Sequence, residues 1–349
     1  VTDTYNHKIR KITPAGVVTT FAGSGSAGSL DGTGNAATFN GPCGIGIDQS
    51  GNLYVSEILG YRIRKITPAG VVSTLAGSGA VGVVDGTGTA ASFSNPRDLA
   101  IDNTGNIFVT EQSYNKIRKI TPAGVVTTYA GTLAAIPGCA DGTGTAALFY
   151  QPIGIDIDGS GNLVVCEWGN NTIRKISSAA VVTTFASEGG LGFANGTGSV
   201  ARFYAPTGAV CDASGNLYVT DIGNYRIRKI TPSGVVTTFA GSGSLGTSDG
   251  TGAGASFSNV NDITIDNSGN FYVADAHRIR KITPAGVVTT LCGATTSGFV
   301  DGTGSAAKFN NIAGITCDAS GNLYVADRYN HAIRKITPAG LVTTIAGSG

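Results

Sequence analysis

The sequence predicts an all-β protein built from repeated, four-stranded antiparallel sheets, and three observations support this fold class. The segment Ile-Arg-Lys-Ile recurs every 52 to 56 residues, beginning at Ile9, Ile63, Ile117, Ile173, Ile227, Ile279 and Ile333. A fixed period of this length indicates a repeat architecture. Short β-branched runs lie between Gly, Pro and Asp residues, as is typical of strands joined by turns. The composition agrees, with 53 glycines and 13% charged residues among 349.

One repeat shows how the strands follow from the residues. In residues 95–131 we expect strands at 99–101, 107–110, 116–121 and 125–129. The Asp-Asn-Thr-Gly-Asn segment at 102–106 and the Pro-Ala-Gly segment at 122–124 are turn sequences, because Asp bonds its own backbone and Gly accepts positive φ. Four short strands joined in this order predict one antiparallel sheet per repeat.

A long connection follows each fourth strand, and it contains a recurring Asp-Gly-Thr-Gly segment. This segment starts at Asp31, Asp85, Asp141, Asp249 and Asp301, and Asn195 takes the place of Asp in one copy. An Ala-Ala-x-Phe segment then predicts one helical turn, with the Phe packed against the sheet. Four-stranded sheets repeated around an axis form a β-propeller, in which closure protects the strand edges.

The residues of one repeat carry a family resemblance. The string Pro42-x-Gly-Ile-x-Ile-Asp48-x-x-Gly-Asn-Leu-Tyr-Val-x-Glu57, followed by Arg62-Ile-Arg-Lys-Ile, resembles the NHL repeat. Asn6-His7 and Asn330-His331 match the Asn-His pair of the family name. The resemblance covers essentially the whole chain and implies an NHL-type β-propeller, usually a recognition platform. The Asp-Gly-Thr-Gly subtype resembles propellers of large bacterial surface or secreted proteins. Such a resemblance defines the scaffold and not the ligand.

The number of blades follows from counting strands. Third and fourth strands occur seven times, whereas the first strand and its turn occur six times, because Val1-Thr2-Asp3 aligns with Val55-Ser56-Glu57. We expect seven blades, the first without its innermost strand; six blades, the commoner number in the family, are the alternative. We expect one domain over residues 1–349, with repeats at 1–40 (partial), 41–94, 95–150, 151–204, 205–258, 259–310 and 311–349.

The bulk properties exclude several classes of function. The net charge is +1, so there is no overall attraction to nucleic acid or anionic membrane. No apolar run approaches the roughly 20 residues of a membrane helix, so we expect no membrane insertion. The chain has no methionine, so we expect a processed or partial product. The seven Arg-Lys pairs account for 14 of the 23 basic residues, which spreads positive charge evenly and argues against RNA binding.

Features present in every copy are expected to serve the fold. The acidic residues before each third strand are interpreted as ion-pair or loop-capping groups, and they are Asp3, Glu57, Glu111, Glu167, Asp221, Asp275 and Asp327. The Asp-Gly-Thr-Gly segments are interpreted as turn and helix caps, because one Asp per loop supplies too few of the six to eight oxygens that Ca²⁺ requires.

The histidines and cysteines give no metal pattern. His7, His277 and His331 share one repeat position, and no His-x-His or Cys-x-x-Cys spacing indicates zinc. We therefore expect no metal and no cofactor. Cys166, Cys211, Cys292 and Cys317 replace small or apolar residues and are expected to be small buried groups. Cys43 and Cys139 lie at expected loop or strand-entry positions and could form a disulfide, but their spacing does not predict one.

Two departures from the repeat mark the expected channel mouth. At the entry to the first strand, most copies carry Gly, but Arg97-Asp98 and Asn261-Asp262 place Asp there. Three repeats separate the two pairs, so we expect them on roughly opposite sides of the mouth. They are candidate polar anchors for a ligand on the axis, and drift at a solvated rim is the alternative.

Aromatic residues on the loops between second and third strands are the other candidates. Exposed aromatic side chains on a rigid scaffold suit protein or sugar recognition. The candidates are Tyr114, Trp168, Tyr225 and Tyr329, of which Trp168 is the single tryptophan of the chain. For Trp168, packing between neighbouring blades is the alternative.

We therefore expect a non-enzymatic binding or scaffold module, secreted or at the cell surface, that recognises a protein or a glycan through its loop face. It is expected to belong to a larger surface or filament assembly. The alternative is a metal-dependent lyase or lactonase-like propeller enzyme using Asp98, Asn261 and Asp262; RNA binding is a third hypothesis. Two sequons, at Asn170 and Asn195, are sites of glycosylation if the source glycosylates asparagine.

Overall fold

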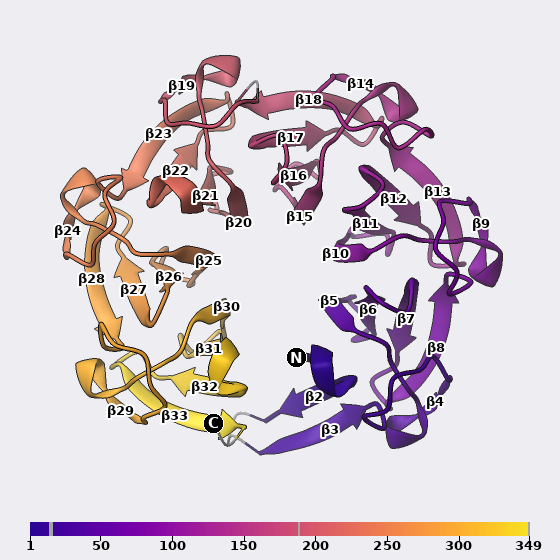
Figure 1. Cartoon of the computed structure of the whole chain (residues 1–349), viewed down its shortest axis with the longest axis horizontal. Helices are drawn as coiled ribbons and strands as arrows, with labels where there is room; N and C mark the ends of the chain where they lie inside the picture. Colours follow the sequence, from indigo (N-terminus) through magenta and orange to yellow (C-terminus); the bar gives the residue numbers. More distant parts are fainter. Residues whose placement is uncertain (14–16, 188, 348–349) are drawn as a thin grey trace. The chain divides into compact units, whose positions relative to one another are not determined.

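The computed structural model describes residues 1–13, 17–187 and 189–347. In this part of the chain, seven antiparallel sheets account for nearly all regular structure (Figure 1). Each sheet is a blade of a β-propeller fold, so the expectations of an all-β chain and of seven blades are confirmed. The chain forms two compact units, Val1–Thr184 and Phe185–Gly349, which are described separately.

The first unit contains four blades. The first consists of β1 (Thr2–Asp3), β2 (Lys8–Ile12) and β3 (Val18–Ala22). The second consists of β4 (Gly32–Thr33), β5 (Pro42–Ile47), β6 (Leu53–Glu57), β7 (Arg62–Ile66) and β8 (Val71–Ala76). The third consists of β9 (Gly86–Thr87), β10 (Pro96–Ile101), β11 (Ile107–Glu111), β12 (Lys116–Ile120) and β13 (Val125–Ala130). The fourth consists of β14 (Gly142–Thr143), β15 (Pro152–Ile157), β16 (Leu163–Glu167), β17 (Thr172–Ile176) and β18 (Val181–Ala186), within which the first unit ends.

The second unit contains three blades. The fifth consists of β19 (Gly196–Thr197), β20 (Pro206–Cys211), β21 (Leu217–Asp221), β22 (Arg226–Ile230) and β23 (Val235–Ala240). The sixth consists of β24 (Gly250–Thr251), β25 (Val260–Ile265), β26 (Phe271–Asp275), β27 (Arg278–Ile282) and β28 (Val287–Cys292). The seventh consists of β29 (Gly302–Thr303), β30 (Ile312–Cys317), β31 (Leu323–Asp327), β32 (Ala332–Ile336) and β33 (Leu341–Ala346).

The helical segments are all short 3-10 turns. Six lie in the long connections, namely η2 (Gly34–Ala36), η3 (Gly88–Ala90), η4 (Gly144–Ala146), η5 (Gly198–Val200), η7 (Gly252–Gly254) and η8 (Gly304–Ala306). Three lie between second and third strands, namely η1 (Thr4–Asn6), η6 (Ile222–Asn224) and η9 (Arg328–Asn330). The described residues contain no helix that is long and apolar enough to cross a membrane.

The strand count per blade differs from the prediction. Six blades have five strands and not four, because the Gly-Thr of each Asp-Gly-Thr-Gly segment pairs with the fourth strand. In the third blade, for example, Gly86 lies opposite Val126 and Thr87 lies opposite Val125. The first blade has three strands and lacks the innermost one, as predicted. The first strands of neighbouring blades lie side by side within each unit: β5 with β10, β10 with β15, β20 with β25, and β25 with β30 (Figure 1).

The apolar core lies between neighbouring blades. Phe93 of one connection is fully buried and packs with Ile63 and Ala76 of the second blade and with Val109 and Val126 of the third. The equivalent phenylalanines are buried in every connection, as the sequence predicted, and they are Phe39, Phe93, Phe149, Phe203, Phe257 and Phe309.

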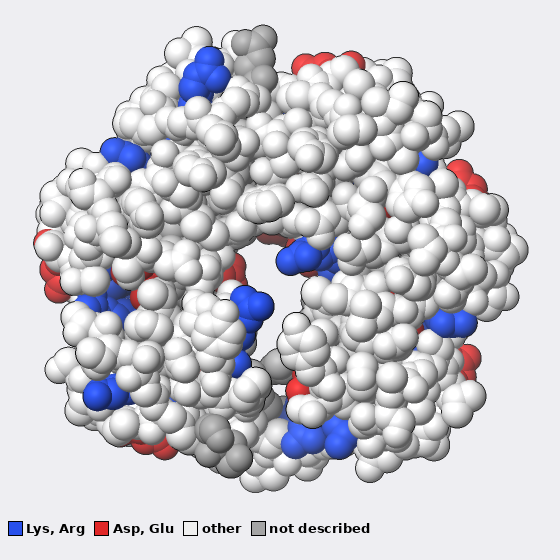
Figure 2. Space-filling view, viewed as in Figure 1, with Lys and Arg blue, Asp and Glu red and all other residues white. Residues whose placement is uncertain are grey.

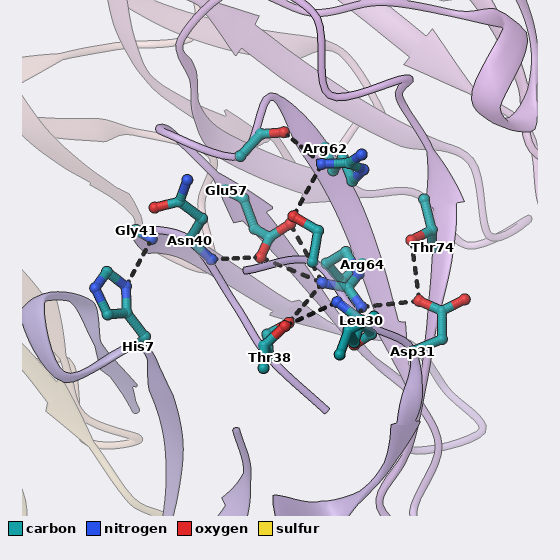
Figure 3. Close-up of polar contacts among 12 residues, drawn as sticks. His7, Leu30, Asp31, Thr38, Asn40, Gly41, Glu57, Arg62, Arg64 and Thr74 are labelled. Carbon is teal, nitrogen blue, oxygen red and sulfur yellow. Dashed lines mark hydrogen bonds and ion pairs between the residues drawn. The ribbon is translucent and has the colours of Figure 1, made fainter. Parts of the chain in front are cut away.

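A fully buried arginine lies at the centre of each five-stranded blade. In the second blade, Arg64 donates to Glu57 at 3.3 Å, to Asp31 at 2.8 Å, and to the backbone carbonyls of Leu30 and Thr38 (Figure 3). The guanidinium carbon also lies 5.2 Å from the ring centre of Phe39. The same arrangement recurs around Arg118, Arg174, Arg228, Arg280 and Arg334, all fully buried.

These contacts correct two sequence interpretations. The ion pair of the repeated acidic residue is confirmed, but it is buried: the side chains of Glu111 and Arg118 are both fully inaccessible. Breaking such a pair is costly because a buried charge loses its partner. The Asp of Asp-Gly-Thr-Gly is not a helix cap; Thr33 holds the N-cap position of η2 and makes no side-chain cap bond. Asp31 instead binds Arg64 and the hydroxyl of Thr74.

Candidate binding surface

In the first and third blades, the loop between second and third strands is fixed at its C-terminal end by a side-chain contact to the next blade. Nδ1 of His7 accepts the N–H of Gly41 at 3.2 Å, and Oδ1 of Asn115 accepts the N–H of Gln151 at 2.8 Å. Each accepting residue holds the left-handed backbone conformation, with φ of 54° and 56°. This repeat position therefore ties one blade to the next.

His277 in the sixth blade makes the same contact, accepting the N–H of Asn311 at 3.1 Å. Two of the three histidines are thereby explained by the fold. The described part of the chain contains no group of three His, Cys, Asp or Glu residues that could hold a metal ion.

Arg97 and Asp98 lie near the start of β10 and make different contacts. Arg97 is exposed, and its guanidinium donates to Oε1 of Gln112 at 3.0 Å. Asp98 is half-buried, and its carboxylate accepts the N–H of Leu99 at 2.9 Å and the N–H of Ile155 in β15 at 3.2 Å. Asp98 therefore joins two first strands of the first unit, and only Arg97 presents its charged group outward.

Asn261 and Asp262 begin β25 and make comparable contacts in the second unit. Asp262 accepts the N–H of Ile263 at 2.9 Å and the N–H of Ile315 in β30 at 3.0 Å. Burial raises the pKa of Asp262 to about 6, and these two N–H bonds oppose the shift. The amide of Asn261 donates to the carbonyl of Ile312 at 2.7 Å and to Asn311 at 3.2 Å.

These contacts engage the polar groups that the enzyme alternative would use. Each carboxylate oxygen of Asp262 accepts a backbone N–H within the second unit. The amide nitrogen of Asn261 donates to β30. Asp98 binds backbone N–H groups in the same way within the first unit.

The predicted aromatic residues fall into two groups. Trp168 and Tyr329 are exposed, at 48% and 56% of their full surface. Arg328 lies 5.4 Å from the ring centre of Tyr329. Tyr114 and Tyr225 are half-buried. Tyr225 occupies the left-handed position that ends η6, with φ of 52°, so its backbone has a turn role.

Two further exposed aromatic residues were missed by the sequence reasoning. Tyr150 and Tyr204 follow the buried phenylalanine of their connections and are 39% and 44% exposed. Each ring lies against a glycine of the adjacent loop, Tyr150 on Gly169 and Tyr204 on Gly223, so closely that a Cβ there would overlap the ring. The sequence does mark these two tyrosines, because the other repeats carry Asn or Ser at this position, namely Asn40, Ser94, Ser258 and Asn310.

Tyr150 and Trp168 are held together at one end of the fourth blade. The N–H of Tyr150 binds Oε1 of Glu167 at 2.7 Å, and the N–H of Trp168 binds the carbonyl of Gln151 at 3.1 Å. Glu167 is itself buried and paired with Arg174. Burial raises the pKa of Glu167, and the guanidinium of Arg174 opposes that shift. Two exposed rings thus stand on a backbone anchored to the buried network.

Charge and thiol chemistry contribute little to this surface. Figure 2 shows Lys, Arg, Asp and Glu scattered singly or in small groups over a mainly uncharged face. All six cysteines are free, including Cys43 and Cys139, so the pairing that was left open does not occur. Burial raises the pKa of Cys166 to about 12, which keeps that thiol protonated.

The fold and these loops define a β-propeller whose blades are repeated around buried arginines. A family model described as NHL repeat matches residues 309–336. NHL repeat-containing protein 2 from Bos taurus is 27% identical over 325 residues, covering 81% of this chain and 44% of that protein. The chain is therefore a seven-bladed β-propeller with an NHL-repeat match in its last blade.

A second relative is protein SUPPRESSOR OF QUENCHING 1, chloroplastic, from Arabidopsis thaliana. It is 26% identical over 271 residues, covering 73% of this chain and 26% of that protein. The chain thus spans between about a quarter and under a half of the length of these two curated relatives.

Solved structures share the fold at low sequence identity. Virginiamycin B lyase from Staphylococcus aureus has a TM-score of 0.60 and 17% identity, covering 87% of this chain and 83% of that chain. An auxiliary nutrient binding protein from Bacteroides thetaiotaomicron has a TM-score of 0.60 and 18% identity, covering 98% and 76%. A gluconolactonase from Xanthomonas campestris has a TM-score of 0.52 and 11% identity, covering 87% and 86%.

Proposed function

We propose that this chain is a non-enzymatic binding module that recognises a protein or a glycan through the loop face formed by its second-to-third-strand loops and its long connections. The observation that carries the proposal is the exposed pair of Tyr150 and Trp168 on backbone fixed by Glu167 and Gln151. Aromatic residues on preorganised loops supply contact area at low entropic cost, which favours recognition.

Most polar residues that recur in the repeats make contacts within the fold, and this supports the proposal. The buried acidic residues neutralise the blade arginines, and Asp98 and Asp262 join neighbouring first strands. His7 and His277 accept backbone N–H groups. Residues engaged in this way serve the scaffold, and the exposed aromatic residues are left to meet a partner.

The enzyme alternative draws on two neighbours, the virginiamycin B lyase and the gluconolactonase. At 17% and 11% identity these likenesses concern the fold. The carboxylates of Asp98 and Asp262 already accept backbone N–H groups within their own units, so we favour binding over catalysis. The nutrient binding protein among the neighbours is 18% identical, so its likeness also concerns the fold.

We further propose an extracellular or cell-surface location, as part of a larger assembly and without nucleic-acid partners. Partial coverage of the longer relatives supports a modular role. The six buried arginines cannot reach phosphate, and this removes much of the basic charge that RNA binding requires.

A paired array experiment tests the proposed function. Wild-type protein and the Trp168→Ala variant are applied to a glycan array and to an array of secreted proteins. We expect at least one saturable ligand whose binding is lost in the variant. Absence of any ligand, or ligands that bind both proteins equally, would contradict the proposal. Turnover of virginiamycin B or gluconolactone, with or without added Mg²⁺ and Ca²⁺, would instead favour the enzyme alternative.

A further inference from the structure

We propose that Tyr150, Gln151 and Trp168, here called the Trp168 patch, bind an uncharged sugar ring of a polysaccharide. The inference rests on the proposed function and narrows its ligand class to neutral glycans. It is argued from the fourth blade alone, which lies in the first unit.

The ring of Tyr150 packs against Gly169 of the neighbouring loop. Gly169 lies so close beneath it that an added Cβ would stand 2.6 Å from Cδ1 and 2.7 Å from Cγ of the ring. The ring nevertheless keeps 39% of its surface. Part of the ring therefore packs closely against the backbone of Gly169 while the residue stays open to solvent.

Trp168 is a second exposed aromatic residue, and its backbone is hydrogen-bonded to that of Gln151, the residue after Tyr150. It directly precedes Gly169, on which Tyr150 lies, and its N–H is fixed by the carbonyl of Gln151. Its side chain is 48% exposed. Packing between blades, the alternative considered from the sequence, does not account for so much exposed indole surface.

Gln151 supplies polar recognition at the same place. Its backbone is held from both sides, the N–H by Asn115 and the carbonyl by Trp168. Its side-chain amide makes no hydrogen bond with any described residue, and the residue is half-buried. A carboxamide offers both donors and an acceptor, as hydroxyl groups require. Asn170 cannot take this role, because its amide already binds Gly138 and Glu167.

The absence of charge selects among ligand classes. Residues 149–151 and 168–171 include no charged side chain. Nucleic acid would require cations for phosphate, and an acidic polysaccharide would require them for its carboxylates. A pyranose ring has an apolar C–H face that stacks on an aromatic ring and an edge of hydroxyl groups. Two aromatic rings with one free carboxamide match that combination.

The fifth blade provides a matched comparison within the chain. There Tyr204 lies on Gly223 in the same way, but Ile222 stands at the position of Trp168 and Ala205 at that of Gln151. Trp168→Ile and Gln151→Ala therefore install residues that this scaffold accepts elsewhere. Tyr150→Asn does the same, because Asn40 and Asn310 hold the equivalent position.

The single tryptophan makes the test direct, because its fluorescence reports on this site alone. The wild-type protein is titrated with a soluble β-glucan, a soluble α-glucan and a galactomannan, and with polygalacturonate as the charged comparison. We expect a saturable fluorescence change with at least one neutral polysaccharide, protection of Trp168 from acrylamide quenching, and much weaker binding of polygalacturonate.

The variants are compared with the same polysaccharide on immobilised ligand, after circular dichroism confirms their fold. Loss of one stacked ring is expected to weaken binding on the order of tenfold or more for Trp168→Ile and Tyr150→Asn. Gln151→Ala should weaken it less. No change with any neutral polysaccharide, or equal binding by all variants, would overturn the sugar assignment. If a secreted protein still binds and loses affinity in Trp168→Ile, the proposed function stands and the ligand is a protein.

Discussion

Nη2 of Arg228 lies 2.9 Å from Oδ1 of Asn195, at the place where the other buried arginines meet an aspartate. Arg64, Arg118, Arg174, Arg280 and Arg334 each have two carboxylate partners, whereas Arg228 pairs only with Asp221 among the described residues. The fifth blade therefore has one negative charge fewer around its buried cation than the other five-stranded blades.

Asn195→Asp is expected to stabilise the protein. The new carboxylate would occupy the position that Asp141 holds beside Arg174, where the side chain is 51% exposed. Because the site is half exposed, the gain is modest, about 0.5–1 kcal/mol. Thermal unfolding should show a midpoint higher by about 1–3 °C. The reverse change, Asp141→Asn, is the control and should lower the midpoint. A lower midpoint for Asn195→Asp, or a higher one for Asp141→Asn, would contradict the role given to these carboxylates.

Arg118→Met is expected to destabilise severely. It leaves Glu111 buried without its partner, which costs about 3–5 kcal/mol. Arg10→Met is the matched control, because Arg10 has the same sequence position but is half-buried, and among the described residues its guanidinium bonds the hydroxyl of Thr20. Urea unfolding measures both. Glu111→Gln added to Arg118→Met should recover part of the loss, since it removes the stranded charge. Equal effects of the two arginine variants would refute a special role for the buried pairs.

Asp262 should give the protein a specific pH dependence. Its folded pKa of about 6 lies above the ordinary value of 3.8, so the folded state binds the proton more tightly than the unfolded state. Its contribution to the free energy of unfolding therefore falls as pH rises from about 4 to 6, by up to about 2 kcal/mol because the side chain is partly exposed. Subtracting the stability curve of Asp262→Asn from that of the wild type should reveal this slope. A difference that is flat over this range would contradict the assignment.

His7 offers a test of the contact between neighbouring blades. Asn at this position should keep the bond to Gly41, because Asn115 makes the equivalent bond in the same backbone conformation. Tyr should lose it while still accepting the conformation, as Tyr61 does at φ of 53°. Losing one such bond costs about 0.5–1.5 kcal/mol. Chemical unfolding of His7→Asn and His7→Tyr measures the difference, and equal stabilities would show that the bond is unimportant.

Much of the fold could be predicted because each repeat is defined by residues that lie close together in the sequence. Alternating β-branched residues and turn sequences define four strands, and the seven copies define seven blades. The fifth strand was missed because it is only two residues long and pairs with a strand about 40 residues later, such as Gly86 with Val126. Sequence spacing alone does not reveal such a contact.

The burial of the ion pairs was missed for a related reason. Asp31 and Arg64 are 33 residues apart and belong to a connection and a strand, so their meeting depends on the complete blade. The acidic and Asp-Gly-Thr-Gly residues looked like separate exposed turns in the sequence. In the structure they surround one cation, which explains why both recur.

The candidate site was predicted only in part. Trp168 and Tyr329 are exposed as expected, but Asp98 and Asp262 use their carboxylates to join first strands. Tyr150 was overlooked because a tyrosine after a buried phenylalanine resembles one more core residue. Its significance depends on Gly169, which lies in another loop and allows the ring to settle on backbone.

The most direct test of the central claim combines ligand affinity and melting temperature for Trp168→Ile. The repeated polar residues hold the fold, and the exposed aromatic side chains contact the ligand. This variant should therefore keep the wild-type melting temperature and lose on the order of tenfold or more in affinity for the polysaccharide that the wild-type protein binds. A variant that melts at a clearly lower temperature but binds with unchanged affinity would show that Trp168 serves the fold, and would contradict the account.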